Sequence, residues 1–561
     1  MDKRSLAALF LIALVIVGGQ LLMPRTPPPV VSADSSTTTR QATPDSGPAS
    51  PVISPRPTVS TATSVTPAQP KLAAVRAETV SVSQGGRSAQ FVTAGAAPVS
   101  VTLPAQYPDL KRRNGPLSIT PTHGPLMRYR IVNGADTISL DDLAFTATHS
   151  GSTTEFVSSS PDVRVTYDLS PDHFLTHANV TLTGASPDAR LLIDLAQDLR
   201  SGEADTTEDL RHLAYGFRRV KGDAESVMLQ KLDSTKYRVE PGPIEWVAIR
   251  NKYFAFAVIA RDTAKGFTEL GLRGGHRRAD GIPTGVATAS MPMSANGATF
   301  DLYTGPQSWT ALRALGHDLI NINPYAGWAW LRPVVQPFAT IVMRLLLGLK
   351  AAVGLSYGWV LVIFGISIRL LLWPLNQSAM RTSIKMQRLQ PELAALQKRY
   401  AKDPEGQRTA MVKLYQAHGM SPFSPLMGCL PMLLPMPILF ALYFVFQNTI
   451  EFRGVQFLWL PDISLRDPYY ITPILMGASM LVLSWIGMRA APPNPQAKVM
   501  GYMMPAMFTM MFLNFASGLN LYYAVQNLVA IPQQWMLTRE RVKATEGAKS
   551  AKAITPLKAP R

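Results

Sequence analysis

The chain has 561 residues, more than one compact core holds, and 47% of them are hydrophobic while only 16% are charged. This balance favours a membrane protein over a soluble enzyme. The formal net charge of +17 is compatible with nucleic-acid binding, anionic lipid or topology signals, and only the placement of the basic residues distinguishes these. The single cysteine, Cys429, excludes a disulfide framework and a thiolate metal cluster.

The N-terminal segment is predicted to be a transmembrane anchor followed by a tether. Residues 1–23 carry a long apolar run after Lys3 and Arg4, which should hold this end in the cytoplasm. A Val-Ser-Ala triplet at 31–33 resembles a signal-peptide cleavage site, but it lies far beyond the apolar run, so we expect the anchor to be retained. Residues 24–74 are rich in Pro, Ser and Thr and are predicted to be disordered.

Residues 75–321 are predicted to form an antiparallel β-sandwich. Apolar and polar residues alternate over 163–169, as a half-buried strand requires. Residues 246–249 and 253–259 are predicted to be two strands joined by a turn at 250–252. Long helical patterns are scarce in this region, which therefore belongs to an all-β class.

The remaining sequence is predicted to be a polytopic helical membrane bundle. Residues 322–355 hold an apolar run interrupted by Arg344 and Lys350, which indicates a linker and a short interfacial helix. Residues 356–537 are predicted to form a five-helix core. Together with the anchor its segments give six spans, the last five at 357–373, 426–446, 471–488, 499–515 and 519–535.

Basic residues concentrate in the loop 380–422 and in the tail 538–561, whereas the loop after the third span carries only Arg453 and Arg466 against three carboxylates. The positive-inside rule therefore places the basic loop, the tail and the N-terminus in the cytoplasm, and the β domain in the periplasm. Motifs of nucleic-acid recognition are absent, so DNA is not an expected partner.

The basic loop is predicted to be a helical hairpin that receives substrate or a ribosome. Apolar residues recur with helical spacing from 386 to 400, a turn is predicted at 403–406, and a second helix at 407–418. A solvated topology signal is the alternative interpretation. The candidate contact residues on this hairpin are Lys385, Arg388, Lys398 and Arg399.

Arg369 is the one charged residue in the span 357–373. Charges inside a membrane usually face protein or a watery cavity. Arg369 also lies one helical turn before Trp373-Pro374, so its side chain could instead extend to the lipid headgroups. Position alone leaves the two interpretations evenly balanced.

The last span carries polar residues on one face, since Asn520, Tyr523 and Asn527 are three and four residues apart. A polar face must meet protein or water, and ordinary hydrogen bonding between helices would also explain it. The histidines of the β region fit no metal-ligand spacing and no nucleophile motif, and no nucleotide site is present. We therefore expect no enzymatic activity, no cofactor and no metal.

Several segments resemble the YidC family of membrane protein insertases, in matching order along nearly the whole chain. The segments that carry the resemblance are Arg369-Leu370-Leu371-Leu372-Trp373-Pro374, Gly428-Cys429-Leu430-Pro431, Asp467-Pro468-Tyr469-Tyr470-Ile471 and Leu521-Tyr522-Tyr523.

The resemblance implies a β-supersandwich outer domain and a five-helix core with a hydrophilic groove that opens to the cytoplasm and the lipid. Arg369 matches the groove arginine of the family, and Tyr523 matches a substrate-contacting tyrosine. Gly365 departs from the pattern, because some members carry a hydroxyl residue there. The expected function is insertion and folding of nascent membrane proteins in the bacterial inner membrane, alone or with the Sec translocon, with the ribosome and membrane lipids as further partners.

Two other functions remain open from the residues alone. A transporter or channel is suggested by Arg369 and by the prolines of the third span, and it predicts solute saturation or conductance. A sugar-modifying or sugar-binding protein is suggested by the size of the β region, and it predicts activity from residues 75–321 alone.

Overall fold

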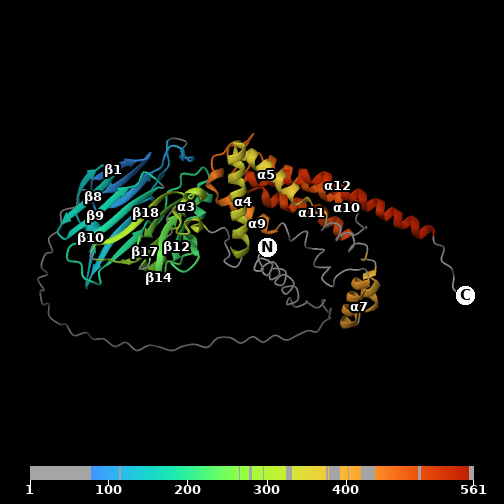
Figure 1. Cartoon of the computed structure of the whole chain (residues 1–561), viewed down its shortest axis with the longest axis horizontal. Coiled ribbons are helices and arrows are strands. Elements are labelled where there is room, and N and C mark those ends of the chain that lie inside the picture. Colours follow the sequence, from blue (N-terminus) through green and yellow to red (C-terminus); the bar gives the residue numbers. More distant parts are fainter. Residues whose placement is uncertain are drawn as a thin grey trace, which may run out of the picture. The chain divides into compact units, whose positions relative to one another are not determined.

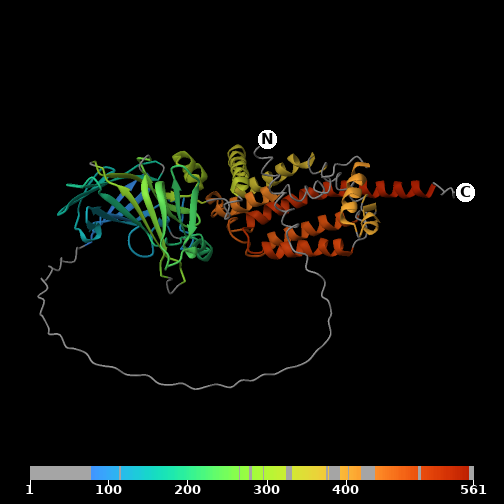
Figure 2. The same cartoon turned by 90° about the horizontal axis from the view of Figure 1, so that it is seen from below.

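The computed structural model describes residues 77–323, 332–374, 377, 389, 392–393, 395–401, 403–417, 436–489 and 495–554, apart from 113–114, 173, 264–265, 277–280 and 295. The predicted anchor and tether lie outside these residues, as do Lys385, Arg388 and Cys429. Apart from the short helix Thr206–Arg211, the described strands precede the described α-helices along the chain (Figures 1 and 2).

The β region consists of two antiparallel sheets, which confirms the predicted all-β sandwich. The small sheet has the order β1-β2-β3-β4, and the fourteen-stranded sheet runs from β6 at one end to β7 at the other. The strands are β1 Thr79–Gln84, β2 Arg87–Val92, β3 Ala97–Thr102, β4 Ser118–Ile119, β5 Met127–Asn133, β6 Asp136–Ser139, β7 Thr146–Ser150, β8 Thr153–Ser159, β9 Asp162–Leu169, β10 Leu175–Leu182, β11 Arg190–Leu195, β12 Ala214–Arg219, β13 Ala224–Met228, β14 Arg238–Arg250, β15 Phe254–Ala260, β16 Phe267–Gly274, β17 Gly285–Pro292 and β18 Ala298–Pro306.

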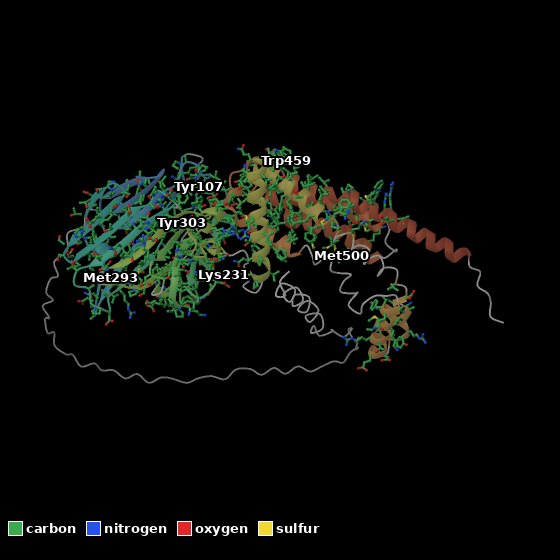
Figure 3. All side chains as sticks on the ribbon, viewed as in Figure 1. Tyr107, Lys231, Met293, Tyr303, Trp459 and Met500 are labelled. Atoms are coloured by element: carbon green, nitrogen blue, oxygen red, sulfur yellow. The ribbon has the colours of Figure 1, made fainter. Side chains whose placement is uncertain are left out.

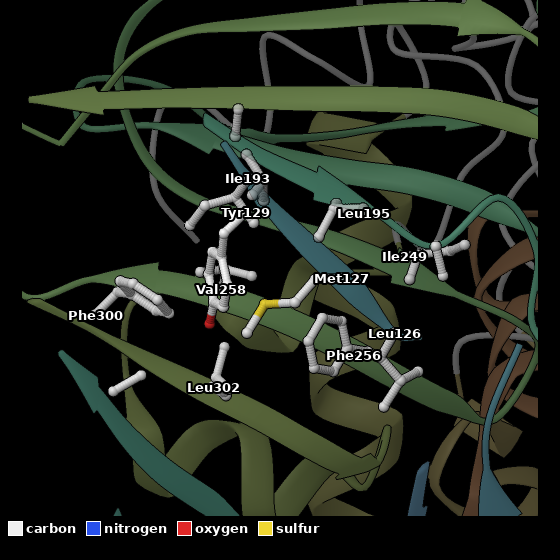
Figure 4. Close-up of a cluster of buried hydrophobic side chains, with 14 of the residues drawn as sticks. Leu126, Met127, Tyr129, Ile193, Leu195, Ile249, Phe256, Val258, Phe300 and Leu302 are labelled. Atoms are coloured by element: carbon white, nitrogen blue, oxygen red, sulfur yellow. The ribbon is translucent and has the colours of Figure 1, made fainter. Parts of the chain in front are cut away.

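Buried and exposed side chains alternate along the strands, which explains why these residues form a sandwich. In β9 the apolar residues are buried and the intervening residues are largely exposed or half-buried, as the alternation predicted. Strands β14 and β15 pair as a hairpin around the predicted turn, and every residue of β15 is buried. Side chains from several strands, among them Tyr129, Ile193 and Phe256, meet in one apolar core (Figure 4).

The helices are α2 Thr206–Arg211, α3 Trp309–Leu315, α4 Arg332–Val353, α5 Tyr357–Leu371, α7 Pro404–Ala417, α9 Met436–Asn448, α10 Ile471–Met488, α11 Pro495–Phe512 and α12 Ser517–Ile554. Buried residues of α4, α5, α9, α10 and α12 share a second apolar core. Trp459, in the loop between α9 and α10, and Met500, near the start of α11, lie at different ends of this helical region (Figure 3).

Two described helices, α4 and α10, are long and apolar enough to cross a membrane by length and composition. The predicted count of six spans is therefore not confirmed. α4 has 22 residues and is longer than the short interfacial helix that we predicted. α5 has 15 residues, which is shorter than a helix that crosses a membrane by length alone. The predicted third span is described only from Met436 onward.

Two predicted boundaries differ from the structure. Residues 403–406 are not a turn between helices, because α7 begins at Pro404 and the Asp403 carboxylate accepts the Gly406 N–H at 2.9 Å. An aspartate followed by proline is a helix start, since proline at the first position has no N–H to leave unsatisfied. α12 continues through the predicted tail to Ile554, beyond the ends of its neighbours (Figures 1 and 2), because residues 538–554 are rich in strong helix formers.

Candidate functional site

A cavity of about 460 Å³, the inner cavity, lies among α5, α9, α10 and α12. Its apolar lining includes Ile438, Leu442 and Leu483. Its polar lining comes mainly from α12, which presents successive turns to the cavity. The polar residues are Arg369, Ser484, Tyr522, Tyr523, Gln526, Asn527 and Gln534.

Arg369 lines this cavity from the last turn of α5. Its Nη2 donates to Oε1 of Gln533 on α12 at 3.1 Å, and Gln533 in turn donates to the carbonyl of Trp373 at 3.3 Å. Nε of Arg369 is buried and has no partner, and no ion pair with Arg369 forms among the described residues. The cation is therefore held toward α12 by a neutral amide, with part of its hydrogen-bonding capacity unused.

α5 and α12 pack closely at Gly365, which lies one turn before Arg369. A Cβ at position 365 would stand 3.2 Å from Cγ1 of Val525, which is closer than ordinary contact. The bare backbone lets Nε2 of Gln526 donate to the Gly365 carbonyl at 2.9 Å and to the Tyr522 hydroxyl at 3.0 Å. At this position the main-chain carbonyl supplies a polar contact to α12.

Of the predicted polar face of α12, Tyr523 and Asn527 line the inner cavity. The Tyr523 hydroxyl is buried and has no hydrogen-bond partner among the described residues, while Nδ2 of Asn527 donates to the Ser479 hydroxyl on α10 at 3.2 Å. Asn520 does not line the cavity. It is fully buried, and its Nδ2 donates to the Phe512 carbonyl at the end of α11 at 3.0 Å. Asn520 therefore joins two helices, whereas Arg369, Tyr523 and Asn527 share one cavity.

Gln526 and Gln533 were not among the predicted site residues, although Gln533 accepts from Arg369 and Gln526 binds the Gly365 carbonyl one turn before it. They are seven residues apart, which places them on one face of a helix beside the predicted face. Their spacing was visible in the sequence, but the identity of the partner helix was not. Only the packing of α12 on α5 brings Gln533 to Arg369.

In the described part of the basic hairpin, Lys398 and Arg399 are exposed and the apolar residues turn inward. Leu389 is buried, and Leu393, Leu396 and Tyr400 are half-buried, which is the apolar face that the spacing predicted. Both cations are therefore free to meet an external surface.

The β region also contains polar cavities, and the histidines there have structural contacts. His177 pairs with Asp301 at 2.7 Å, and Nδ1 of His212 lies 3.0 Å from the carbonyl of Glu208. Within the described residues, no group of three or more His, Cys, Asp or Glu side chains is arranged to hold a metal ion.

The sequence matches two family profiles that together span most of the chain. Residues 348–545 match the 60Kd inner membrane protein family, and residues 89–341 match the YidC periplasmic domain. The membrane protein insertase YidC of Chlorobium phaeovibrioides is 32% identical over 413 residues, which covers 69% of this chain and 68% of that protein. The membrane protein insertase YidC of Dechloromonas aromatica is 35% identical over 311 residues, covering 55% and 54%. A crystal structure of an active YidC insertase aligns over 82% of this chain and 93% of its own, at 18% identity and a TM-score of 0.33.

Proposed function

Because the chain belongs to the YidC family of membrane protein insertases, with a periplasmic domain, we propose that it works by taking polar segments of nascent inner-membrane proteins into the inner cavity. The observation that carries this proposal is the position of Arg369, a cation with no counter-ion among the described residues, in a cavity whose other lining side chains are neutral. No carboxylate appears in that lining among the residues the structure describes.

The energetic problem of insertion is the passage of a hydrophilic tail across hydrocarbon. An acidic side chain is costly in lipid and less costly beside a fixed cation and hydrogen-bond donors. In the proposed mechanism the tail enters the inner cavity, where Arg369, Tyr523 and Asn527 replace part of its hydration. The apolar segment of the substrate then moves sideways into lipid, driven by hydrophobic partitioning and by the membrane potential.

The membrane topology that we propose follows from the charge pattern of the sequence. The N-terminus, basic hairpin and tail are cytoplasmic, the β region is periplasmic, and the helical core is multi-pass. The ribosome, the Sec translocon and anionic lipid are the proposed partners besides the substrate. A solute transporter with the same cavity would instead show conductance or saturable uptake in liposomes.

Depletion tests the proposed function directly. When the protein is removed from cells, small inner-membrane proteins with one or two spans should accumulate uninserted within the time of depletion. Insertion is measured by protease protection of pulse-labelled substrate, and a secreted protein that crosses the membrane by another route serves as the control. Normal insertion of all such substrates after complete depletion would refute the proposal.

The basic hairpin is proposed to recruit substrate or ribosome. Deletion of residues 390–416 with a short linker should slow insertion severalfold, because the exposed cations Lys398 and Arg399 are lost. Lys398→Gln with Arg399→Gln is the milder variant and keeps the helices intact. Co-sedimentation with ribosomes and the rate of insertion are the two measurements. If both are unchanged while topology stays correct, the hairpin is only a topology signal.

A further inference from the structure

A second polar cavity, of about 610 Å³, is here called the outer cavity. It lies where the β region meets the helices, between α2 and the β14–β15 turn on one side and α9, the loop after it and the α11–α12 turn on the other. Its charged lining residues are Asp205, Glu208, Arg211, Lys252 and Arg466. It therefore belongs neither to the inner cavity nor to the β region alone.

The charges of the outer cavity do not cancel. Its three cations face two carboxylates. Asp205 caps α2 by accepting the Glu208 N–H at 3.0 Å, and Glu208 lies 3.5 Å from Arg211. Among the described residues, neither Lys252 nor Arg466 forms an ion pair.

Lys252 is the more informative of these two cations, because only 5% of its surface is exposed. Its backbone N–H donates to Asp209 at 3.0 Å, and its ammonium lies 5.2 Å from the centre of the Tyr253 ring. The buried Asp209 carboxylate also interacts electrostatically with the Lys252 ammonium, so this cation is partly compensated within the fold while it lines the cavity. A lysine that is nearly buried and lines a cavity is still suited to hold an anion.

Aromatic rings in contact with one another connect the outer cavity to the inner one. Tyr443 and Phe515 line the outer cavity and are 5.3 Å apart, measured between ring centres. Phe515 lies 4.8 Å from Phe512, and Phe512 lies 5.8 Å from Tyr523, which lines the inner cavity. These four rings form a continuous row of contacts, here called the aromatic partition, between the inner cavity, which one cation lines, and the outer cavity, which three cations line.

We propose that the outer cavity is the exit site for the translocated segment of the substrate, which binds there through its carboxylates. This inference rests on the proposed function. A tail leaves Arg369, passes the aromatic partition as the rings change rotamer, and pairs with Lys252 and Arg466 before release. The ligand is an acidic peptide segment, and its charge is the feature recognised.

The test uses the full-length protein and one single-span substrate whose translocated tail carries zero, one or two Asp residues. Lys252→Gln combined with Arg466→Gln should slow translocation of the two-Asp tail about fivefold and leave the neutral tail unchanged. Lys252→Arg with Arg466→Lys should restore the rate. Lys236→Gln is the control, since the Lys236 side chain is 83% exposed and does not line the cavity.

A second readout follows the path of the tail. In a Cys429→Ser background, a single tail cysteine should cross-link first to Met480→Cys, in the inner cavity, and later to Thr207→Cys, in the outer cavity. Cross-linking to position 207 before 480, or never to 207, overturns the exit site.

The outcomes separate this inference from the proposed function. If the neutral tail inserts equally well without the protein, the proposed function fails. If insertion needs the protein but the glutamine pair slows every tail equally, or changes none, only the exit site fails. A slowing that follows the phosphatidylglycerol content of proteoliposomes and ignores tail charge would assign the cavity to lipid headgroups instead.

Discussion

Replacement of Arg369 by alanine should slow insertion of a substrate with two Asp residues in its translocated tail by about tenfold or more, and should barely affect a neutral tail. The reason is the absence of any other cation in the lining of the inner cavity among the described residues. Arg369→Lys should keep much of the activity, because an ammonium still attracts carboxylates. Arg369→Glu should be the most harmful, because it repels the tail.

Extension of Arg369 to the lipid headgroups makes a different prediction. All three changes would then be mild and independent of tail charge. Arg344→Ala on α4 is a matched control, because Arg344 is an exposed arginine in a neighbouring helix. In a Cys429→Ser background, Arg369→Cys should react with a water-soluble thiol reagent. An inert cysteine together with a flat tail series would exclude the hydrophilic-cavity mechanism.

Above pH 7, where Glu203 is ionised in the folded protein, replacement of Arg453 by leucine should lower the free energy of unfolding by about 3–5 kcal/mol, since it leaves a buried carboxyl without its partner. Arg453, in the loop after α9, donates from Nε to both oxygens of Glu203 in the β region, at 2.8 and 2.9 Å. Its Nη2 donates to the Pro108 carbonyl at 2.7 Å, and its guanidinium lies 5.2 Å from the Phe254 ring. The side chains of Arg453 and Glu203 are 3% and 6% exposed.

The double variant with leucine at both positions should recover most of this stability, because no unpaired charge remains. Arg164→Leu is the matched control, since Arg164 pairs with Glu155 on the surface, where an ion pair contributes at most about 1 kcal/mol. Unfolding of the purified full-length protein in detergent, followed by tryptophan fluorescence, gives the comparison. Equal losses for Arg453→Leu and Arg164→Leu would show that water reaches the pair between the β region and the helices.

The same carboxyl predicts a pH dependence. Burial raises the pKa of Glu203 from 4.5 to about 7, with Arg453 opposing the shift and the nearby Asp209 and Asp462 adding to it. A carboxyl with a raised pKa in the folded state binds its proton more tightly when the protein is folded. The contribution of Glu203 to the free energy of unfolding is therefore fully present below about pH 4.5, and it is lost as the pH rises through about 7. Glu203→Gln should flatten this part of the stability profile, and an unchanged slope would assign it to Asp209 and Asp462, whose pKa values burial also raises.

The sequence alone determined whether each region forms strands or helices, because hydrophobic periodicity shows which side of a strand or helix is buried. The alternation in β9, the β14–β15 hairpin and the apolar α10 are local features, and the structure has all three. The second helix of the hairpin was predicted to begin at residue 407, but α7 begins at Pro404. α12 includes the predicted span 519–535 and continues into the basic tail, whose helical content was not predicted.

Only the tertiary structure decided which polar residues meet. Arg369 and Gln533 are 164 residues apart, and Glu203 and Arg453 are 250 apart, so no periodic pattern relates them. The residues of the predicted polar face of α12 have different contacts for the same reason. Asn520 meets the end of α11 while Tyr523 and Asn527 meet the inner cavity, because neighbouring positions on one face contact different helices. Helical spacing establishes that side chains share a face, and the packing of helices determines what that face touches.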